Sequence, residues 1–386
     1  MDRLGETVEL LERLIAFPTI SSESNLEMIV FLADRLSAAG ARVEMQQDAG
    51  GTKANLFATI GPEEPGGILL SGHTDVVPVE DQDWTTDPFA MVARDGRLYG
   101  RGTCDMKGFI ATAVALAPLY AEAATRRPIH FAFTHDEEVG CLGAQALAGL
   151  LRGREVLPSV AIIGEPTLMQ VIEGHKGCCE YSVHFTGLEG HGSAPERGVN
   201  AVEYAVRYVA RLIELKERLK ARAPASSRFD PPWTTISTGA LRGGVAHNVI
   251  PGKARIDWEM RPVQPGDAEF VKADLSAFCA QELIPAMRRV DPSADIVTEV
   301  VGEVDGLTPM DECEARDLVL ALAGGREAGT VSFGTEAGIF QALGMSAVIC
   351  GPGSIAQAHR PDEYLSLDQL SRCLDMLERL AARLGP

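Results

Sequence analysis

The spacing of apolar and polar residues follows two different patterns along this chain of 386 residues. In residues 6–177, apolar runs of strand length alternate with longer stretches whose apolar positions recur every three or four residues. The short runs predict buried strands, and the longer stretches predict amphipathic helices. Strands that alternate with helices are typical of a parallel or mixed sheet with helices on both faces. This part of the chain is therefore expected to have an α/β fold.

The predicted elements of this first part are helices at 6–17, 24–40, 106–122 and 144–151, and strands at 42–45, 55–60, 67–72, 129–134 and 160–163. Ser24 and Glu27 have the spacing of a capping box, in which each side chain bonds the other residue's backbone N–H. The second helix is therefore expected to begin at Ser24 and to end at Gly40, a natural residue beyond a helix end.

The pattern changes at about residue 178, where polar and apolar residues alternate strictly. The elements predicted next are strands at 179–186, 234–241, 253–260 and 295–303, and helices at 199–222 and 267–284. This β-α-β-β-α-β order is typical of a ferredoxin-like α+β domain. From about Leu307 the first pattern returns, with helices at 312–323, 336–343 and 366–384 and a strand at 346–350. Residues 178–304 are therefore expected to form a domain inserted into a larger one built from 1–177 and 305–386.

The composition is that of a soluble globular protein, with 46% hydrophobic residues and a mean hydropathy of +0.03. No apolar run approaches the length that spans a bilayer. The first residues lack the basic and apolar segments of a signal peptide. The eight cysteines form no C-x-x-C pair, and reduced thiols are the simplest interpretation. A cytoplasmic location is therefore expected.

The formal net charge is −19. This charge argues against nucleic acid or an anionic membrane surface as a partner, since both repel an acidic protein. It agrees with a small substrate of positive or zero net charge.

Histidine and acidic residues recur where the predicted strands of the larger domain end, as ligand-binding residues do in α/β proteins. They are His73, Asp75, Asp105, Glu137, Glu138, Glu165 and His359. An isolated His-x-Asp is more often a surface histidine near a turn. Two imidazoles with several carboxylates and no thiolate, however, suit a pair of divalent ions. A carboxylate that bridges two ions is typical of two-metal hydrolytic sites.

Glu137 and Glu138 are adjacent, and neighbouring side chains on extended backbone point in different directions. One of the two can therefore bind metal while the other faces a water molecule as a general base. The pair predicts a hydrolytic site.

Six motifs of this sequence resemble those of the M20 metallopeptidase family. They are S-G-H-T-D-V-V-P at 71–78, G-R-G-x-x-D-M-K-G at 100–108, D-E-E-x-G at 136–140, G-E-P-T at 164–167, G-H-G-S-A-P at 190–195 and A-H-R-P-D-E at 358–363. The resemblance covers essentially the whole chain, in order. Five segments look like the acetylornithine deacetylase branch of this family: 164–167, 174–177, 198–201, 335–337 and 351–364.

The resemblance implies a dinuclear metal site, with zinc as the expected metal and cobalt as the alternative. His73 and Glu165 would bind one ion. Glu138 and His359 would bind the other, and Asp105 would bridge the two.

The resemblance also implies roles for residues around the metal-bridging water. Asp75 would hydrogen-bond His73 without binding metal itself. Glu137 would take a proton from the water and later pass it to the leaving amine. A cis peptide bond is implied between Asp105 and Met106.

Other predicted site residues would contact the substrate. From the residues alone, His191 between two glycines fits a turn and a functional histidine equally well. The resemblance implies that it reaches a partner subunit's active site and stabilises an oxyanion. Asn248 and Arg261 would hold the α-carboxylate of the substrate, and Gly353 would offer backbone contacts. We expect Glu336 to contact a substrate ammonium, because it lies in the branch-specific segment.

The activity that the resemblance implies is hydrolysis of N2-acetyl-L-ornithine to L-ornithine and acetate in arginine biosynthesis, by a homodimer joined through the inserted lid domain. The alternative within the same chemistry is another N-acyl amino acid, such as N-acetylcitrulline, succinyl-diaminopimelate or an aminoacylase substrate. A non-catalytic binding protein is disfavoured because every ligand position and Glu137 are filled. His175 and Lys176 have no assigned role, and Gly334 departs from the cysteine that close relatives often have there.

Overall fold

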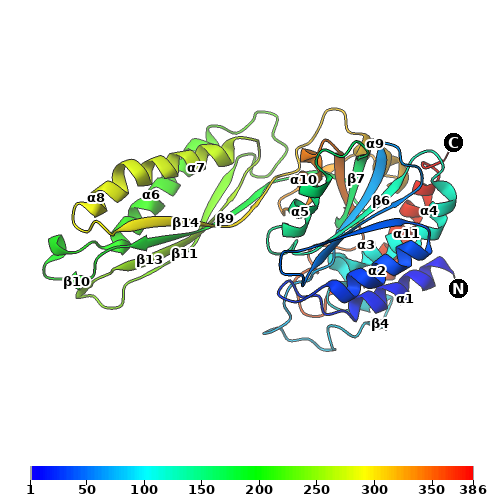
Figure 1. The fold of residues 1–386 in the computed structure, drawn as a ribbon, viewed down its shortest axis with the longest axis horizontal. Helices are drawn as coiled ribbons and strands as arrows, with labels where there is room; N and C mark the ends of the chain where they lie inside the picture. The colour runs from blue at the N-terminus through cyan, green and yellow to red at the C-terminus, as the bar shows by residue number, and fades with distance from the viewer. Residues whose placement is uncertain (1, 386) are drawn as a thin grey trace. The chain divides into compact units, whose positions relative to one another are not determined.

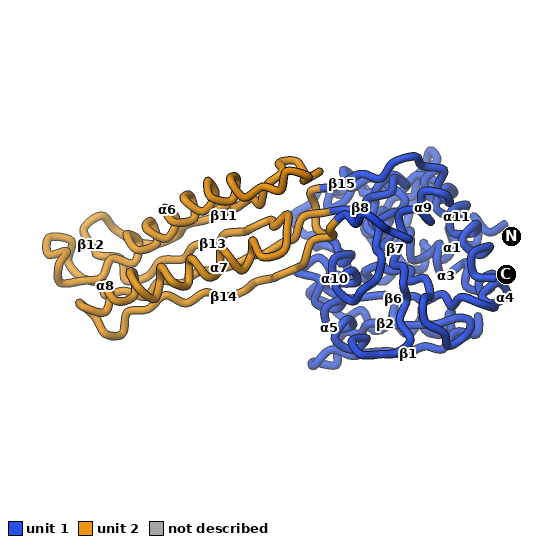
Figure 2. The backbone as a smooth tube through the Cα atoms, turned by 90° about the horizontal axis from the view of Figure 1, so that it is seen from above, with its two compact units in different colours: residues 1–174, 309–331, 335–386 blue, residues 175–308, 332–334 orange. Residues whose placement is uncertain are grey.

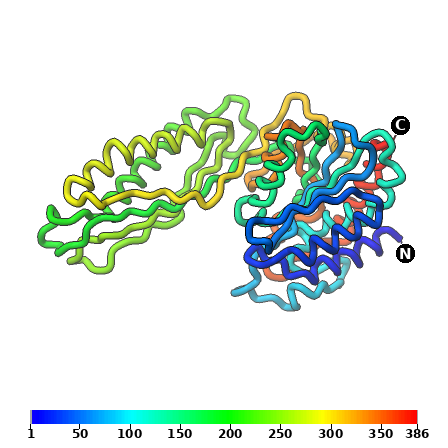
Figure 3. The backbone as a smooth tube through the Cα atoms, in the orientation of Figure 1, coloured from blue at the N-terminus to red at the C-terminus, as the bar shows by residue number. Residues whose placement is uncertain are grey.

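The computed structural model describes residues 2–385 and divides the chain into two compact units. Unit 1 comprises residues 1–174, 309–331 and 335–386, and unit 2 comprises residues 175–308 and 332–334 (Figure 2). Both ends of the chain belong to unit 1, and the middle of the chain, green to yellow in Figure 3, forms unit 2. The boundaries expected from the sequence are 178 and 304, and residues 332–334 were not expected to separate from their neighbours.

Unit 1 is built on an eight-stranded sheet. Its order is β1 (Arg42–Gln47), β2 (Ala54–Ile60), β6 (Ile129–Thr134), β3 (Gly67–His73), β7 (Pro158–Pro166), β16 (Ser346–Gly351), β8 (Ile172–His175) and β15 (Gly329–Val331). Four adjacent strands, in the order β6, β3, β7 and β16, form three parallel pairs. The pairs β1–β2, β2–β6 and β16–β8 are antiparallel. The predicted mixed α/β sheet is therefore confirmed.

Helices cover both faces of this sheet (Figure 1). One hydrophobic cluster contains residues of α1 (Arg3–Ile15), α2 (Leu26–Ala38), α3 (Gly108–Ala115), α4 (Ala117–Ala123), α9 (Glu314–Ala323) and α11 (Leu367–Ala381). Ile68 and Leu70 of β3 belong to that cluster, whereas the equally buried Leu69 between them does not. Alternate strand residues face opposite sides. Helices α5 (Leu142–Leu151) and α10 (Ala337–Ala342) contact each other and the other face.

Two local predictions for unit 1 are wrong in detail. The capping box at Ser24 does not form, because α2 begins after Asn25, whose side chain instead bonds the backbone of Ala54. The single helix predicted at 106–122 begins only at Gly108, because Asp105 and Met106 have non-helical backbone angles, and it is divided into α3 and α4. Pro118 lies in the first turn of α4, where its missing N–H is tolerated but an uninterrupted helix is not.

A small three-stranded sheet holds two loops of unit 1 side by side. Its order is β17 (Tyr364–Ser366), β5 (Arg97–Tyr99) and β4 (Val92–Arg94). Strand β17 follows His359, and β5 precedes Asp105. Two predicted site residues that are far apart in the sequence thus lie on adjoining segments.

Unit 2 has a four-stranded sheet in the order β11 (Thr235–Gly243), β13 (Lys253–Arg261), β9 (Cys178–Thr186) and β14 (Asp295–Val304). All three strand pairs are antiparallel. Helices α6 (Ala201–Lys220), α7 (Asp267–Phe278) and α8 (Ile284–Arg288) cover one face (Figure 1). Tyr181, Val183 and Phe185 of β9 point into this core. The predicted ferredoxin-like arrangement is confirmed.

No helix within residues 2–385 is both long enough and apolar enough to cross a membrane. Six cysteines carry free thiols that are buried, which protects them from oxidants in solution: Cys104, Cys141, Cys179, Cys313, Cys350 and Cys373.

The buried histidine of β6, His130, makes the stability of the protein depend on pH. Its ring stacks on Phe57, and its Nδ1 lies 2.9 Å from the hydroxyl of Thr59. Burial lowers the pKa of His130 to about 4. An unfolded histidine has a pKa of about 6.5, so below that pH the unfolded chain binds a proton that the folded chain does not. The free energy of unfolding therefore falls as the pH falls towards 4, by up to about 1.4 kcal/mol per pH unit.

We expect His130→Gln to make the free energy of unfolding less dependent on pH than in the wild type. Urea unfolding at several pH values between about 7 and 5 measures this dependence. His184→Gln, which removes an exposed histidine of unit 2, is the control. Equal slopes for His130→Gln and the wild type would contradict the prediction.

Candidate active site and metal centre

The predicted ligands gather at one edge of the large sheet because neighbouring parallel strands end there. Strand β3 ends at His73, and β7 carries Glu165 near its end. Strand β6 lies beside β3 and leads into Glu137 and Glu138. Carboxyl ends of parallel strands form the usual ligand-binding edge of an α/β sheet.

Asp105 lies between the two predicted histidine ligands. Its Oδ1 is 2.9 Å from Nε2 of His73, and its Oδ2 is 3.4 Å from Nε2 of His359. Each carboxylate oxygen thus faces a different imidazole. The peptide bond between Asp105 and Met106 is cis, as the family resemblance predicts. This geometry allows Asp105 to serve two ions at once.

The other two predicted ligands lie on either side of Asp105. Glu165 Oε1 is 3.7 Å from His73 Nε2, and Glu138 Oε2 is 3.1 Å from His359 Nε2. Glu165 Oε1 is buried and accepts no hydrogen bond from the described residues. The five predicted ligands are therefore together in two groups, one with His73 and one with His359, that share Asp105.

Asp75 supports both the first histidine and the adjacent glutamates. Its Oδ1 accepts a hydrogen bond from the backbone N–H of Glu137 (3.1 Å) and its Oδ2 one from the N–H of Glu138 (3.3 Å). The Ser21 hydroxyl also donates to Oδ2 (2.7 Å). Nδ1 of His73 lies closer to the backbone carbonyl of Asp75 (2.8 Å) than to its carboxylate (3.6 Å). Asp75 therefore orients His73 mainly through its backbone and holds the glutamate loop through its side chain.

Glu137 and Glu138 point to different parts of the site. Oxygen atoms of Glu137 and Glu165 and a ring nitrogen of His73 lie within 4.8 Å of one another, whereas Glu138 groups with His73 and Asp105. The preceding Asp136 has a left-handed φ of 56° and pairs with Lys53 Nζ at 2.6 Å. Aspartate tolerates this conformation better than most residues. Both glutamates thus lie near His73, with Glu137 beside Glu165 and Glu138 beside Asp105.

The site concentrates negative charge in a buried place. Burial raises the pKa of Glu137 and Glu165 well above the usual value and also raises that of Glu138. The neighbouring carboxylate of Asp105 raises all three further. Carboxylates crowded in this way need compensating positive charge, which bound cations supply in such sites.

The two histidines respond to the same carboxylates. Hydrogen bonds with Asp105 and Glu138 raise the pKa of His359 to about 10. Burial lowers the pKa of His73, but Asp105 and the other carboxylates outweigh it and raise the pKa well above the usual value. Each imidazole is therefore surrounded by groups that favour a positive charge at its position.

Two predicted substrate contacts do not fit the structure. Glu336 has no exposed surface, and its carboxylate accepts hydrogen bonds from the hydroxyls of Ser71 and Thr134. It ties the ends of β3 and β6 together from inside the protein, where a substrate ammonium cannot reach it. The buried Gly353 donates its N–H to Gln369 (3.2 Å) and accepts from Leu168 N (2.6 Å), so both its backbone groups are occupied.

The predicted residues of unit 2 lie at two places. His191 and Asn248 are exposed, and the backbones of their loops meet at a hydrogen bond from Gly192 N to Asn248 O (2.8 Å). Arg261 ends β13, next to the start of β9, and pairs with Glu259 at 2.8 Å. At about 3.4 Å per residue, the length of β13 puts roughly 27 Å between these places. Unit 2 does not bring Arg261 and Asn248 together.

Three buried charged residues at the border of the site escaped the sequence analysis: Arg101, Lys107 and Glu363. Lys107 Nζ donates to the backbone carbonyls of Leu14 and Phe17 at the end of α1. All three lie inside motifs already recognised. A charge beside glycines and apolar residues is the signal that could have found them, because a buried charge must be paired or hydrogen-bonded.

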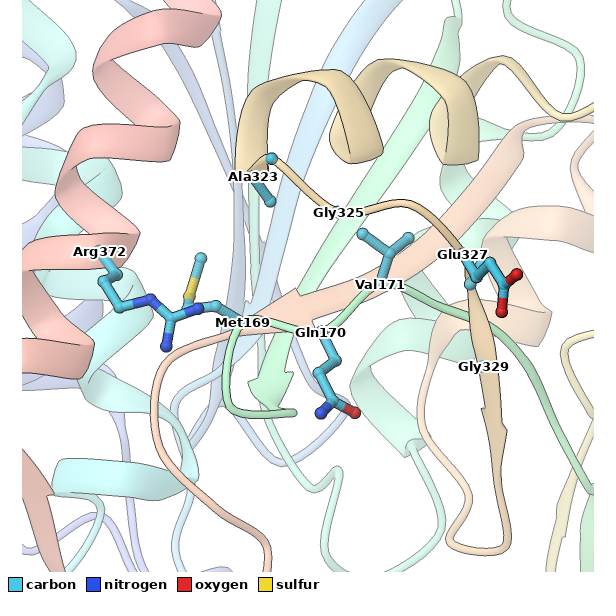
Figure 4. Close-up of a pocket in the computed structure, with 10 residues that line it drawn as sticks. Met169, Gln170, Val171, Ala323, Gly325, Glu327, Gly329 and Arg372 are labelled. Carbon is cyan, nitrogen blue, oxygen red and sulfur yellow. The ribbon is translucent and has the colours of Figure 1, made fainter.

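Unit 1 also has a pocket that contains none of the predicted site residues. It is lined by Met169, Gln170, Val171, Ala323, Gly324, Gly325, Glu327, Ala328, Gly329 and Arg372. Arg372 and Glu327 lie on opposite sides of it (Figure 4). Small residues and backbone form most of its wall, and it carries no cluster of metal ligands.

The model of "Peptidase family M20/M25/M40" matches residues 69–383. An acetylornithine deacetylase of Myxococcus xanthus is 40% identical over 388 residues, which cover 99% of this chain and 98% of that protein. An acetylornithine deacetylase of Shigella sonnei is 35% identical over 371 residues and 94% of each chain.

Solved structures show the same fold. An M20 family metallo-carboxypeptidase of Sulfolobus solfataricus has a TM-score of 0.75 at 16% identity and covers 100% of this chain and 99% of that one. A dinuclear metal-binding M20 peptidase of Bacillus subtilis has a TM-score of 0.65 at 15% identity, with 99% and 98% covered. Because the family model spans most of the chain and the relatives align over nearly all of it, the chain belongs to peptidase family M20/M25/M40.

Proposed function

We propose that this protein is a two-metal amidohydrolase that converts N2-acetyl-L-ornithine to L-ornithine and acetate, a step of arginine biosynthesis. The observation that carries the proposal is the arrangement of His73, Glu165, Glu138 and His359 around the shared carboxylate of Asp105. Relatives named acetylornithine deacetylase, 35% to 40% identical over nearly the whole chain, support the choice of substrate.

The residues fit a pair of divalent ions. Imidazole and carboxylate donors without thiolate suit zinc, with cobalt as the alternative. The buried Glu165 Oε1, which has no donor among the described residues, is an oxygen that a cation would satisfy. His73 and Glu165 would hold one ion, His359 and Glu138 the other, and Asp105 both. A solved relative described as a dinuclear metal-binding peptidase supports two ions.

When bound, the ions polarise the acyl carbonyl and lower the pKa of water, which is what amide hydrolysis at neutral pH requires. Glu137 accepts the proton of the attacking water and passes it to the nitrogen as the C–N bond breaks. Asp75 holds the backbone of Glu137 at 3.1 Å, so the base keeps its position through both proton transfers. Acetate and the free amine are the products.

We also propose that the active enzyme is a homodimer in which unit 1 is catalytic and unit 2 is the lid and dimerisation domain. Strand β13, about 27 Å long at about 3.4 Å per residue, lies between the loop of Asn248 and Arg261, too far for the two to hold the carboxylate of one amino acid from a single chain. His191 and Asn248 would therefore serve the site of a second copy. Exposed Val206 (53%) and Ile213 (55%), seven residues apart on α6, support an apolar contact there.

The six buried free thiols support a cytoplasmic location for the enzyme. Unpaired cysteines persist where glutathione and thioredoxin keep thiols reduced.

A substrate panel tests the proposed function. The zinc-loaded protein is assayed with N2-acetyl-L-ornithine, N-acetyl-L-citrulline, N-succinyl-diaminopimelate and N-acetyl-L-methionine. We expect the highest kcat/KM for N2-acetyl-L-ornithine, by about 10- to 100-fold over the methionine derivative, since pocket contacts are each worth about 1–3 kcal/mol. A preference for the succinyl substrate would overturn the substrate assignment. A protein that binds two ions and hydrolyses none of the four would overturn the catalytic assignment.

A further inference from the structure

Glu363 and Arg101 form an ion pair at 2.8 Å, and each side chain is only 1% exposed. We propose that this pair is a positioning unit that sets the spacing of Asp105 and His359, and so the affinity of the ion that these two residues hold with Glu138. The inference rests on the proposed two-metal function and adds two residues to it that touch no reacting atom.

The carboxylate of Glu363 is wrapped by the segment that leads to Asp105. It accepts four hydrogen bonds, two on each oxygen: from Arg101 Nη1 (2.8 Å) and Gly102 N (3.0 Å), and from Cys104 N (2.8 Å) and Asp105 N (3.1 Å). Buried N–H groups that lose their acceptor are costly, so this segment is stable only around a carboxylate. Glu363 thus holds the backbone of Asp105 directly.

Gly102 shows that the segment is shaped for this contact. Its φ of 83° is left-handed, and a Cβ there would approach Val76 Cγ1 at 2.8 Å and Lys107 Cδ at 3.1 Å. Only glycine turns its N–H towards Glu363 at this point without strain.

Arg101 extends the same contact to the loop of His359. Its Nη1 is 3.4 Å from the carbonyl oxygen of Arg360, and its Nη2 is 2.6 Å from Oε1 of Gln82. Gln82 in turn donates its Nε2 to the carbonyl oxygen of His359 (3.0 Å). The Arg101 guanidinium therefore connects Glu363, and with it Asp105, to two backbone carbonyls of this loop. It reaches that of Arg360 directly and that of His359 through Gln82.

The two ion positions depend on this pair to different degrees. His73 and Glu165 lie on β3 and β7, whose backbone hydrogen bonds in the sheet hold them in place. Asp105 and His359 lie on loops, and the side chain of His359 is 53% exposed. Loss of the ion pair should therefore disturb the Asp105–His359 side of the site more than the His73–Glu165 side.

Glu363→Gln tests the proposal while keeping the volume of the side chain. The new amide group has one oxygen to accept hydrogen bonds, and its NH₂ would face donors instead of accepting from them. Gln82→Ala is a second variant, on a half-buried residue, that cuts the connection from Arg101 to His359 and leaves Glu363 intact. It also removes the acceptor of Trp84 Nε1 (3.1 Å). It carries the same test if Glu363→Gln does not fold.

Glu173→Gln is the matched control. Glu173 is also a buried carboxylate of unit 1, paired with Arg316 at 3.0 Å. The other backbone contacts of Arg316 go to the carbonyls of Met310 and Asp311, away from the proposed ligands.

The measurement is a titration of the metal-free proteins with Zn²⁺ in competition with a chromophoric chelator, which yields a dissociation constant for each ion. His359→Ala and Glu165→Ala, titrated alongside, assign each constant to its position. We expect Glu363→Gln to weaken the ion at His359 by about 10- to 100-fold, the usual effect of losing a group that orients a ligand. The other ion should weaken less than about threefold, and Gln82→Ala should act in the same direction.

Thermal unfolding of the metal-free proteins separates positioning from stability. Equal weakening of both ions, or lower stability with unchanged affinities, would overturn the inference and leave the pair a purely structural role. A wild-type protein that binds fewer than two ions would instead overturn the proposed function itself.

Discussion

Replacing Glu137 with Gln is expected to lower kcat for amide hydrolysis by about 10²- to 10⁴-fold, the contribution of a positioned general base. The amide side chain has the same shape but cannot accept a proton. The backbone N–H of residue 137 would still bond Asp75, so the loop should keep its conformation. Metal content should be unchanged, because the proposed ligands His73, Glu165 and Asp105 are intact.

Glu138→Gln is the matched control, because it changes the adjacent residue in the same way. Glu138 lies 3.1 Å from His359 Nε2, and its replacement is expected to reduce the metal content of the protein. Release of ornithine and bound zinc are measured for both variants. Full activity in Glu137→Gln, or equal loss of metal from the two variants, would show that the roles of base and ligand are assigned wrongly.

His191→Ala is expected to lower kcat by about 10²- to 10³-fold, the effect of removing one group that stabilises an oxyanion. In the proposed homodimer, this histidine serves the other copy's site. A mixed dimer of His191→Ala and Glu137→Gln chains would then contain one intact site, formed by Glu137 of the first chain and His191 of the second. Each mixed dimer has one intact site of two, so the purified mixed dimers should show about half of wild-type activity.

The two inactive variants are co-expressed with different tags, and the mixed dimers are purified and assayed. A mixture of Glu137→Gln and Glu138→Gln is the control, since both residues belong to unit 1 and no pairing restores an intact site. Inactive mixed dimers would rule out the shared site, and so would a monomeric wild-type protein in solution.

The rhythm of apolar residues was enough to predict both folds. Residues two positions apart in a strand face the same side of the sheet. A period of two in the apolar residues therefore shows which face of the strand meets a core. The alternation at 179–186 reappears as Tyr181, Val183 and Phe185 in the core of unit 2. The order of the eight strands in unit 1 was not predictable, because it depends on pairing between distant segments.

The sequence also indicated which residues gather at the candidate site. Parallel strands end at one edge of a sheet, so His73 on β3 and Glu165 on β7 were expected at the same edge, and the pairing of β3 with β7 makes them neighbours. The recognition of family motifs extended this prediction to Asp105 and His359, which lie on loops. Local sequence and one rule of sheet geometry thus indicated two of the proposed ligands, and the family resemblance implied the rest.

The tertiary structure alone decided which way the remaining side chains point. Glu336 is buried against Ser71 and Thr134 because α10 packs on the sheet, and no local pattern reports that packing. Arg261 and Asn248 lie far apart because β13 runs its full length between them. Sequence patterns report how each segment meets a core, whereas contacts between segments arise only when the whole chain has folded.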